Sequence, residues 1–368
     1  KSMATTSLHE VLEAGVEEGA SDWHIRENQN ISVRIQGRLG EFEFSPDRDF
    51  FDNLFGELLS KKQLEFFQEQ GDVDFAFRED GVGRFRANLH RQRGFFSLTL
   101  RYVQDIVPQL EELNLPAKIH ELAESRRGIV FVCGRTGAGK STTLARMIEH
   151  VNEVKDKHII SIEDPIEFSF QDKHSVIEQR EVGIDTISFD SALVHVMRQD
   201  PDVIVIGEMR DRTSFETAIS AAETGHLVFS TLHTTSASQA LIRLTDMYPQ
   251  EERESVRRSL AESVQGVVCQ ELVTRADGKG LVPAVEVMVK TPIVEKLITN
   301  AQFEKLEQAI DGGTKEGMIS FNQSLYELVQ KGLVNKEHAL AVAHNPEALK
   351  MLLKGIRLNT ADGQILDG

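Results

Sequence analysis

The chain has 368 residues, of which 40% are hydrophobic and 27% charged, and its formal net charge is −17 at pH 7. These values are ordinary for a globular protein, and the length predicts two domains. The acidic balance argues against broad non-specific binding of nucleic acid, which needs a basic surface. Since no apolar run approaches the roughly 20 residues that span a bilayer, we expect no integral membrane segment.

The cysteine content excludes two further classes of protein. Cys133 and Cys269 are far apart in the sequence and form no CxxC pair. A zinc site or a disulfide framework is therefore not expected. This cysteine usage favours a reducing compartment, so we expect a cytoplasmic protein.

Residues 3–104 combine helical and strand patterns in a way typical of an α+β domain. Apolar residues first recur at helical spacing, and Ser60 is a good N-cap for a later helix. Strands are predicted at residues 23–25, 31–35, 73–77, 85–89 and 96–101. We therefore expect a sheet with helices packed on it.

Residues 105–117 contain Pro108 and Pro116 around a stretch without a strong period, so we interpret them as an interdomain linker. A second domain is predicted over residues 118–358, mostly helical from Thr291 onward. Residues 359–368 are predicted to be a loose tail.

The second domain carries continuous apolar runs that alternate with helical stretches, a pattern typical of a parallel sheet buried on both faces. These runs cover residues 129–133, 159–162, 203–206 and 227–231. In such sheets ligands bind at the carboxyl ends of the strands. We therefore expect the chemistry at this edge.

The first run ends in a glycine-rich segment with the pattern of a phosphate-binding loop. It reads Gly134-Arg135-Thr136-Gly137-Ala138-Gly139-Lys140-Ser141, and Thr142 follows. Glycines let the backbone curl so that several N–H groups point at an anion, and the next helix adds its positive end. Lys140 is expected to reach the β- and γ-phosphates and Ser141 to bind Mg²⁺, so ATP and Mg²⁺ are the predicted cofactors.

Acidic residues follow two other runs. Glu208 comes after a strand and a glycine, and we expect it to orient and polarise an attacking water rather than to be a solvated loop residue. Glu163 and Asp164 close another strand, where they can hold Mg²⁺ through water or help to place the nucleophile. Asp164 precedes Pro165, and so it can equally begin a turn.

Histidines and arginines supply further candidates. His226 and His233 flank the last run, either as groups that detect a γ-phosphate or as structural histidines. Arginines gather in a stretch without acidic residues, at Arg84, Arg86, Arg91, Arg93 and Arg101. They can form a basic face for nucleic acid, supply arginine fingers, or protect a solvated edge strand.

Together these motifs resemble the type IV pilus retraction ATPases (PilT/PilU type) of the secretion-ATPase superfamily over nearly the whole chain. The resemblance rests on Ser21 to Ile25, Gly83 to Arg86, the Walker A loop Gly134 to Ser141, the Asp box Ile162 to Phe168, the Walker B region Asp200 to Asp211, and the His box Gly225 to Thr235. It implies an α/β fold, with a PAS-like N-terminal domain followed by a RecA-like P-loop ATPase domain with a helical C-terminal end.

The resemblance also implies a function and partners. The family forms hexameric rings that bind ATP between the two domains and power pilin depolymerisation and twitching motility. On this basis Glu208 is catalytic, Glu163 supports the Mg²⁺ site, His226 and His233 detect the γ-phosphate, and the arginine fingers come from Arg84, Arg93 and Arg101. The implied partners are an inner-membrane pilus platform protein and a paralogous retraction ATPase, at the cytoplasmic face of the inner membrane, without nucleic acid.

Two features bear on the branch of the family. The four-cysteine zinc element usual in assembly and type II secretion ATPases is missing. The Ala-Ile-Arg-Asn-Leu-Ile motif of the principal retraction motors is replaced at residues 293–298, with Glu295 at the arginine position. An accessory paralogue, an assembly or secretion ATPase, a nucleic-acid translocase and a non-hydrolysing scaffold remain as alternatives.

Overall fold

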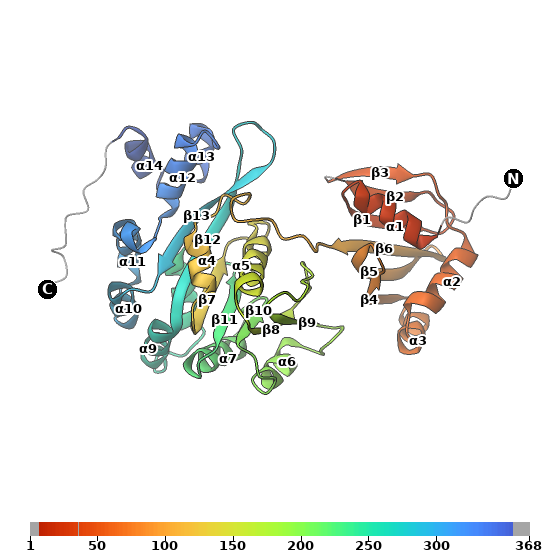
Figure 1. Ribbon diagram of the computed structural model, residues 1–368, viewed down its shortest axis with the longest axis horizontal. Helices are drawn as coiled ribbons and strands as arrows, with labels where there is room; N and C mark the ends of the chain where they lie inside the picture. The colour runs from red at the N-terminus through yellow and green to blue at the C-terminus, as the bar shows by residue number, and fades with distance from the viewer. Residues whose placement is uncertain (1–6, 36, 356–368) are drawn as a thin grey trace. The chain divides into compact units, whose positions relative to one another are not determined.

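The computed structural model describes residues 7–35 and 37–355, so the predicted tail lies outside the described residues. The chain forms two compact units with a mixed α/β fold (Figure 1). The first unit runs to Ile106 and includes Glu167–Ser169, and the second comprises the rest of the chain from Val107. In the part of the chain described, no helix is both long enough and apolar enough to cross a membrane.

The first unit contains a six-stranded sheet in the order β3-β2-β1-β6-β5-β4, with all neighbouring strands antiparallel. Its elements are α1 (Leu8–Glu17), β1 (Ala20–Arg26), β2 (Ile31–Ile35), β3 (Arg38–Phe42), α2 (Arg48–Leu58), α3 (Lys61–Gln70), β4 (Asp72–Glu79), β5 (Gly83–Gln92) and β6 (Phe95–Val103). The five predicted strands and the helix after Ser60 are confirmed. Ser60 and Gln63 form a capping box at the start of α3.

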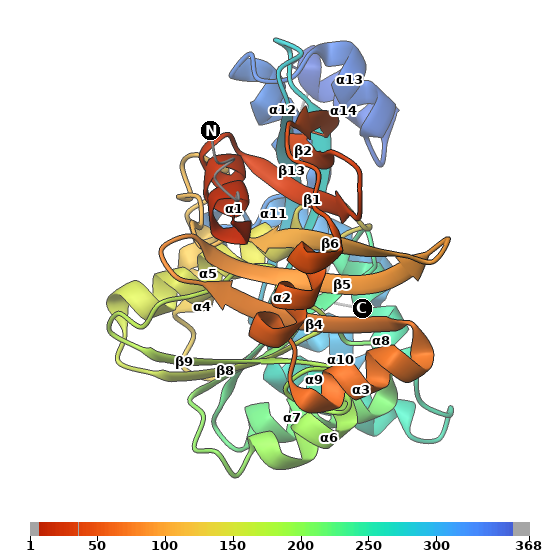
Figure 2. The ribbon, with the colours of Figure 1, turned by 90° about the vertical axis from the view of Figure 1, so that its right-hand side faces the viewer.

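The core of the first unit lies between one face of this sheet and its helices (Figure 2). Trp23 is completely buried, donates its indole N–H to the carbonyl of Val11 at 3.3 Å, and meets the ring of Phe85 edge-on at 5.5 Å. A Cβ at Gly15 would lie 2.6 Å from the Trp23 ring. Glycine at that position therefore lets α1 approach the sheet.

The second unit contains a seven-stranded sheet in the order β13-β12-β7-β11-β10-β8-β9. Its strands are β7 (Gly128–Cys133), β8 (His158–Glu163), β9 (Val176–Glu181), β10 (Val203–Ile206), β11 (Leu227–Leu232), β12 (Val264–Thr274) and β13 (Leu281–Val289). Its helices are α4 (Lys118–Ala123), α5 (Lys140–Val154), α6 (Phe189–Val196), α7 (Arg212–Glu223), α8 (Ala237–Asp246), α9 (Arg253–Ser263), α10 (Pro292–Thr299), α11 (Leu306–Gly312), α12 (Phe321–Gln330), α13 (Lys336–Val342) and α14 (Pro346–Leu353).

The four predicted apolar runs form β7, β8, β10 and β11, which are parallel to their neighbours. The expectation of a wholly parallel sheet is corrected at one edge. There β12 continues the parallel pairing beside β7, but β13 turns back antiparallel to β12. This hairpin was not predicted.

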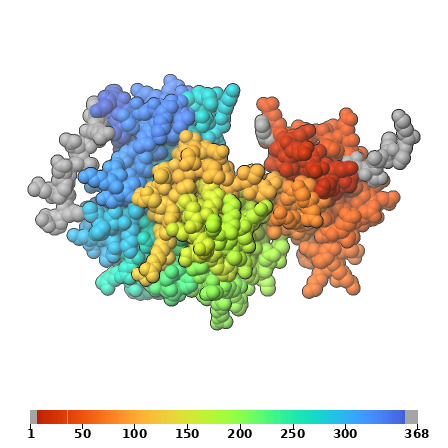
Figure 3. Space-filling model, viewed as in Figure 1, coloured from red at the N-terminus to blue at the C-terminus, as the bar shows by residue number. Residues whose placement is uncertain are grey.

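Helices cover both faces of this sheet, which explains the continuous apolar strands. On one face Val130 and Val132 pack with side chains of α4 and α5. On the other face Ile129 and Phe131 pack with side chains of α7 and α9. Helices α12 to α14 pack on the ends of β12 and β13, and they gather at one corner of the second unit (Figure 3).

Residues 107–117, the larger part of the segment interpreted as a linker, contribute buried side chains to the second unit. Leu110 and Leu115 are buried there. Gln109 accepts a hydrogen bond at 3.1 Å from Arg146, a completely buried residue that also pairs with Glu153 at 2.5 Å. This stretch is therefore anchored by packing and by a buried guanidinium.

The burial of Glu286 on β13 leads us to predict that the stability of the folded protein depends on pH. Burial raises its pKa from 4.5 to about 7; the N–H of Ala237, 2.7 Å from Oε1, opposes this rise, and Glu307 and Asp311 add to it. Between pH 4.5 and about pH 7 the Glu286 carboxyl loses its proton in the unfolded chain but keeps it in the folded protein. The free energy of unfolding therefore falls as pH rises through this range. The full loss corresponds to about 3 kcal/mol.

The measurement is chemical denaturation of wild type and Glu286→Gln at several pH values from 4.5 to 8. We expect wild type to lose stability relative to the variant up to about pH 7, with a constant difference above it. Because all other groups are shared, parallel profiles for the two proteins would contradict this assignment.

Candidate functional site

The predicted phosphate loop joins the buried strand β7 to helix α5, as the sequence indicated. Gly134 has a φ of +152° and Gly139, the N-cap of α5, has a φ of +84°. Both values lie where a side chain is strained, so the glycines are required by the backbone. The result is a tight turn that ends in the positive N-terminus of a 15-residue helix.

Lys140 folds back over this loop. Its Nζ donates to the carbonyl of Gly134 at 2.9 Å and to that of Arg135 at 3.1 Å. The N–H of Gly134 donates to the carbonyl of Leu232 at the end of β11, at 3.1 Å. The loop therefore lies at the carboxyl edge of the sheet, with an ammonium group over it.

Glu208 lies after β10 at the same edge and is held on both sides by basic groups. Its Oε1 is 3.1 Å from Nε2 of His233, and its Oε2 accepts hydrogen bonds from Arg210 at 2.7 and 2.8 Å. Burial raises the pKa of Glu208, but the Arg210 bond and the charges of Arg210, His233 and Lys140 outweigh it, so the pKa falls below its ordinary value. Glu208 is therefore an anion at neutral pH.

The backbone around Glu208 is fixed by the neighbouring strands. The N–H of Gly207 donates to the carbonyl of Ile162 on β8 at 2.8 Å. On β11, the hydroxyl of Thr231 donates to the carbonyl of Gly207 at 2.7 Å, and the carbonyl of Thr231 accepts from the N–H of Met209 at 3.1 Å. Glu208 thus lies in a turn after β10 that is held by hydrogen bonds to β8 on one side and β11 on the other.

Glu163 ends strand β8, next to β10. Its Oε1 accepts hydrogen bonds from the hydroxyl of Ser161 at 2.6 Å and from the amide of Gln179 on β9 at 3.1 Å. Asp164 lies 3.9 Å from Arg210. The structure therefore brings the carboxylates of Glu163 and Asp164 beside the Glu208 cluster.

His226 does not join this cluster. Its carbonyl accepts from the N–H of Gly128, the first residue of β7, at 3.0 Å. Its Nδ1 lies 3.1 Å from the hydroxyl of Thr224 and 3.0 Å from the carbonyl of Ala221. Because β7 and β11 run parallel, His226 is at the opposite edge of the sheet from the phosphate loop. His233, at the other end of β11, is at the correct edge.

The predicted arginines belong to the first unit. Arg84 lies on β5, where its neighbour Phe85 is completely buried. Arg93 occupies the turn between β5 and β6 with a φ of +52°. Arg101 on β6 donates to Asp22 on β1 at 2.8 Å. This ion pair was not predicted, because it depends on the pairing of strands distant in the sequence.

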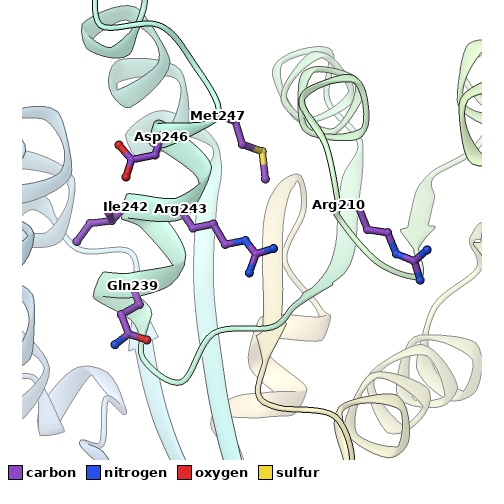
Figure 4. Close-up of a pocket in the computed structure, with 6 residues that line it drawn as sticks. All are labelled: Arg210, Gln239, Ile242, Arg243, Asp246 and Met247. Atoms are coloured by element: carbon purple, nitrogen blue, oxygen red, sulfur yellow. The ribbon is translucent and has the colours of Figure 1, made fainter.

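Arg210 was not predicted as a site residue. The signal was its position two residues after Glu208, within the same turn. It also borders a hollow of about 470 Å³, in which Arg243 extends from α8 toward the loop that carries Arg210 (Figure 4). The remaining lining residues are Gln239, Ile242, Asp246 and Met247. The hollow therefore adjoins the Glu208 cluster through Arg210.

A glycine loop between a buried parallel strand and a helix, with an anionic carboxylate after another strand of the same sheet, is the arrangement typical of a P-loop ATPase. Comparison with known proteins gives the particular family. A family model described as "Type II/IV secretion system protein" matches residues 97–350. The chain belongs to this family, within its type IV pilus retraction ATPases.

Three relatives support this placement. "Type IV pilus retractation ATPase PilT" of Pseudomonas aeruginosa is 39% identical over 92% of this chain and 99% of its own length. "Type IV pilus ATPase PilU" of the same organism is 38% identical over 94% of this chain and 91% of its own length. The solved structure "Crystal Structure of the Pilus Retraction Motor PilT and Bound ADP" superposes with a TM-score of 0.85 at 39% identity, covering 94% of this chain and 99% of that chain.

These comparisons confirm the predicted family, the ATPase class and nucleotide binding. The Legionella pneumophila ATPase DotB has a TM-score of 0.72 at 24% identity, which shows a shared fold alone. The roles of individual residues, Mg²⁺ and the partners stay predictions.

Gly207→Ala tests how the site depends on the turn that carries Glu208. A Cβ at Gly207 would lie 3.0 Å from the carbonyl oxygen of Ile162 and 3.2 Å from Cα of Glu163, so β8 and β10 must separate at their ends. We expect kcat for ATP hydrolysis to fall by about tenfold or more, since small displacements of a reacting group are costly.

The matched control is Gly312→Ala, because a Cβ at Gly312 meets nothing within 4 Å. Steady-state ATPase assays and thermal unfolding are measured on both variants. Equal kcat for Gly207→Ala and wild type would contradict the proposed dependence on this turn.

Proposed function

We propose that this chain is an ATP-hydrolysing motor that powers type IV pilus retraction, with the phosphate loop and Glu208 as its reaction centre. The observation that carries the proposal is the Glu208 carboxylate, held by Arg210 and His233 at the sheet edge that also carries the loop. The charge of Lys140 contributes to the lowered pKa of Glu208, so the Lys140 ammonium and the Glu208 carboxylate interact electrostatically.

In the proposed reaction the loop N–H groups and the N-terminus of α5 bind the phosphates of ATP. Lys140 leaves the loop carbonyls and pairs with the β- and γ-phosphates. Glu208, ionised at neutral pH, orients the attacking water and accepts its proton. His233, 3.1 Å from Glu208, helps to hold this carboxylate in place and is the proposed detector of γ-phosphate loss.

Mg²⁺ fits the proposed site through oxygen ligands. Among the described residues no group of three or more His, Cys, Asp or Glu side chains could hold a metal ion by itself. We infer that the ion would arrive with the nucleotide, and that Ser141 would be a direct ligand and Glu163 would act through water. Mg²⁺ would neutralise charge on the β- and γ-phosphate oxygens.

The finer architecture is also proposed. We assign a PAS-like fold to the first unit and a RecA-like fold to the second, and a homohexamer as the working assembly. Arg84, Arg93 and Arg101 remain the candidates for arginine fingers, although Arg101 would have to leave Asp22. His226 is left out of the site within one chain. An inner-membrane platform protein, at the cytoplasmic face, is the proposed partner.

The residues of helix α10 favour the role of an accessory motor over that of a principal motor for this chain. Val294, Leu297 and Ile298 are buried, so the helix keeps its apolar anchors. Glu295, at the position where principal retraction motors carry arginine, lies 3.9 Å from Lys290. The charge at that position is therefore reversed. A PilU-type role beside a paralogous motor is accordingly our proposal, and an assembly ATPase is the second candidate.

Two substitutions test the reaction centre. Glu208→Gln keeps the size of the side chain but removes its charge, so we expect ATP binding to persist while kcat falls by about 100-fold or more. Lys140→Ala removes the phosphate contact and should abolish binding and turnover together. Glu251→Gln, an exposed change in the same unit, is the control. A kcat for Glu208→Gln close to that of the Glu251→Gln control would contradict the assignment.

Counting surface pili tests the biological role. Cells of the source organism that lack the gene are compared with cells that carry Glu208→Gln. Extra pili that do not retract indicate a principal retraction motor, whereas an unchanged count indicates an accessory paralogue. Bald cells would overturn retraction in favour of assembly. Tight DNA binding that weakens steeply with salt would indicate a translocase instead.

A further inference from the structure

Gln270 lies on β12 directly beside the phosphate loop. It is buried, with 4% of its surface exposed, in a strand whose other interior residues are mostly apolar. In the register of β12 and β7, Cys269 faces Cys133, the last residue before the loop. Gln270, the next residue on β12, therefore lies beside the start of the phosphate loop.

The Gln270 side chain makes two hydrogen bonds to the loop and its helix. Its Nε2 donates to the carbonyl of Ala138 at 2.5 Å. Its Oε1 accepts from the hydroxyl of Thr143, in the first turn of α5, at 2.7 Å. One side chain thus ties the loop to the start of the helix.

The loop also packs closely on Gln270. A Cβ at Gly134 would lie 2.6 Å from the carbonyl oxygen of Gln270, and a Cβ at Gly139 would lie 2.9 Å from its Nε2. Two glycines of the phosphate loop are therefore needed for contact with this one residue, in addition to the positive φ that each adopts.

These contacts fix the direction of a peptide group. In a planar trans peptide the C=O and the following N–H point to opposite sides. With the Ala138 carbonyl bonded to Gln270, the N–H of Gly139 must point away from β12. A loop that binds an anion needs its N–H groups directed at the anion and its carbonyls turned elsewhere.

A purely packing role does not account for this residue. A buried amide without partners destabilises a protein, and an apolar side chain of similar size would fill the same space. Val268 and Leu272 show that β12 accommodates apolar residues on either side of it. The amide is explained by its two polar partners, both of which belong to the phosphate loop and its helix.

We propose that Gln270 is a positioning residue for nucleotide binding, which orients the 138–139 peptide and the first turn of α5 without touching the nucleotide. The inference rests on the proposed function, in which this loop binds the phosphates of ATP. It makes β12, a strand outside the sequence motif, part of the nucleotide site.

The test is the affinity of the full-length chain for fluorescent ADP. Gln270→Met keeps the volume but removes both hydrogen bonds, and Kd should rise by about tenfold or more. Gln265→Met makes the same change on the same strand, where β12 passes Gly128 at the opposite edge of the sheet, and should leave Kd unchanged. Unfolding curves without nucleotide separate lost stability from lost affinity.

Thr143 provides a second measurement that does not depend on folding of Gln270→Met. Thr143→Val removes one of the two hydrogen bonds, and Kd should rise by roughly fivefold. Thr143→Ser keeps the hydroxyl and should bind as wild type. If the Gln270 variant does not fold, the Thr143 pair decides between the outcomes.

The proposal is overturned if wild type binds ADP, Lys140→Ala does not, and Gln270→Met binds within about twofold of wild type. For an unfolded Gln270→Met, equal affinity of Thr143→Val and Thr143→Ser has the same consequence. If Lys140→Ala binds as tightly as wild type, the proposed nucleotide site itself is wrong. The two failures are therefore distinguishable.

Discussion

The parallel pairing of β8, β10, β11 and β7 is the constraint on which the site depends. Parallel strands end at the same edge, so residues that follow them in the sequence meet in space. Lys140, Glu163, Glu208 and His233 come from four separate segments and are assembled there. The same pairing places His226 at the far edge, although it lies only seven positions before His233. Strand direction therefore selects which polar residues can act together.

Charge balance within this edge accounts for the state of the acidic group. Burial alone would favour a neutral Glu208, and its basic neighbours reverse that preference. Glu286 shows the opposite case in the same unit, since burial dominates there and raises its pKa to about 7. The pKa values of two glutamates in one fold are thus shifted in opposite directions by their surroundings.

The hairpin of β12 and β13 connects the nucleotide site to the C-terminal part of the chain. Gln270 on β12 contacts the phosphate loop, while Glu286 on β13 binds the first N–H of α8. The ends of the same hairpin support helices α12 to α14. This one pair of strands therefore contacts both the phosphate loop and the C-terminal helices.

The sequence alone determined the local pieces of this protein. Continuous apolar runs indicated β7, β8, β10 and β11, alternation indicated β4, β5 and β6 of the first unit, and the glycine spacing indicated the phosphate loop. Tertiary structure decided what depends on pairing between distant segments: the antiparallel edge at β13, the position of His226 at the opposite edge from the phosphate loop, the Arg101 pair with Asp22, and the contacts of Gln270. Periodicity records which face of a strand is buried, but strand order and register follow from packing of the whole sheet.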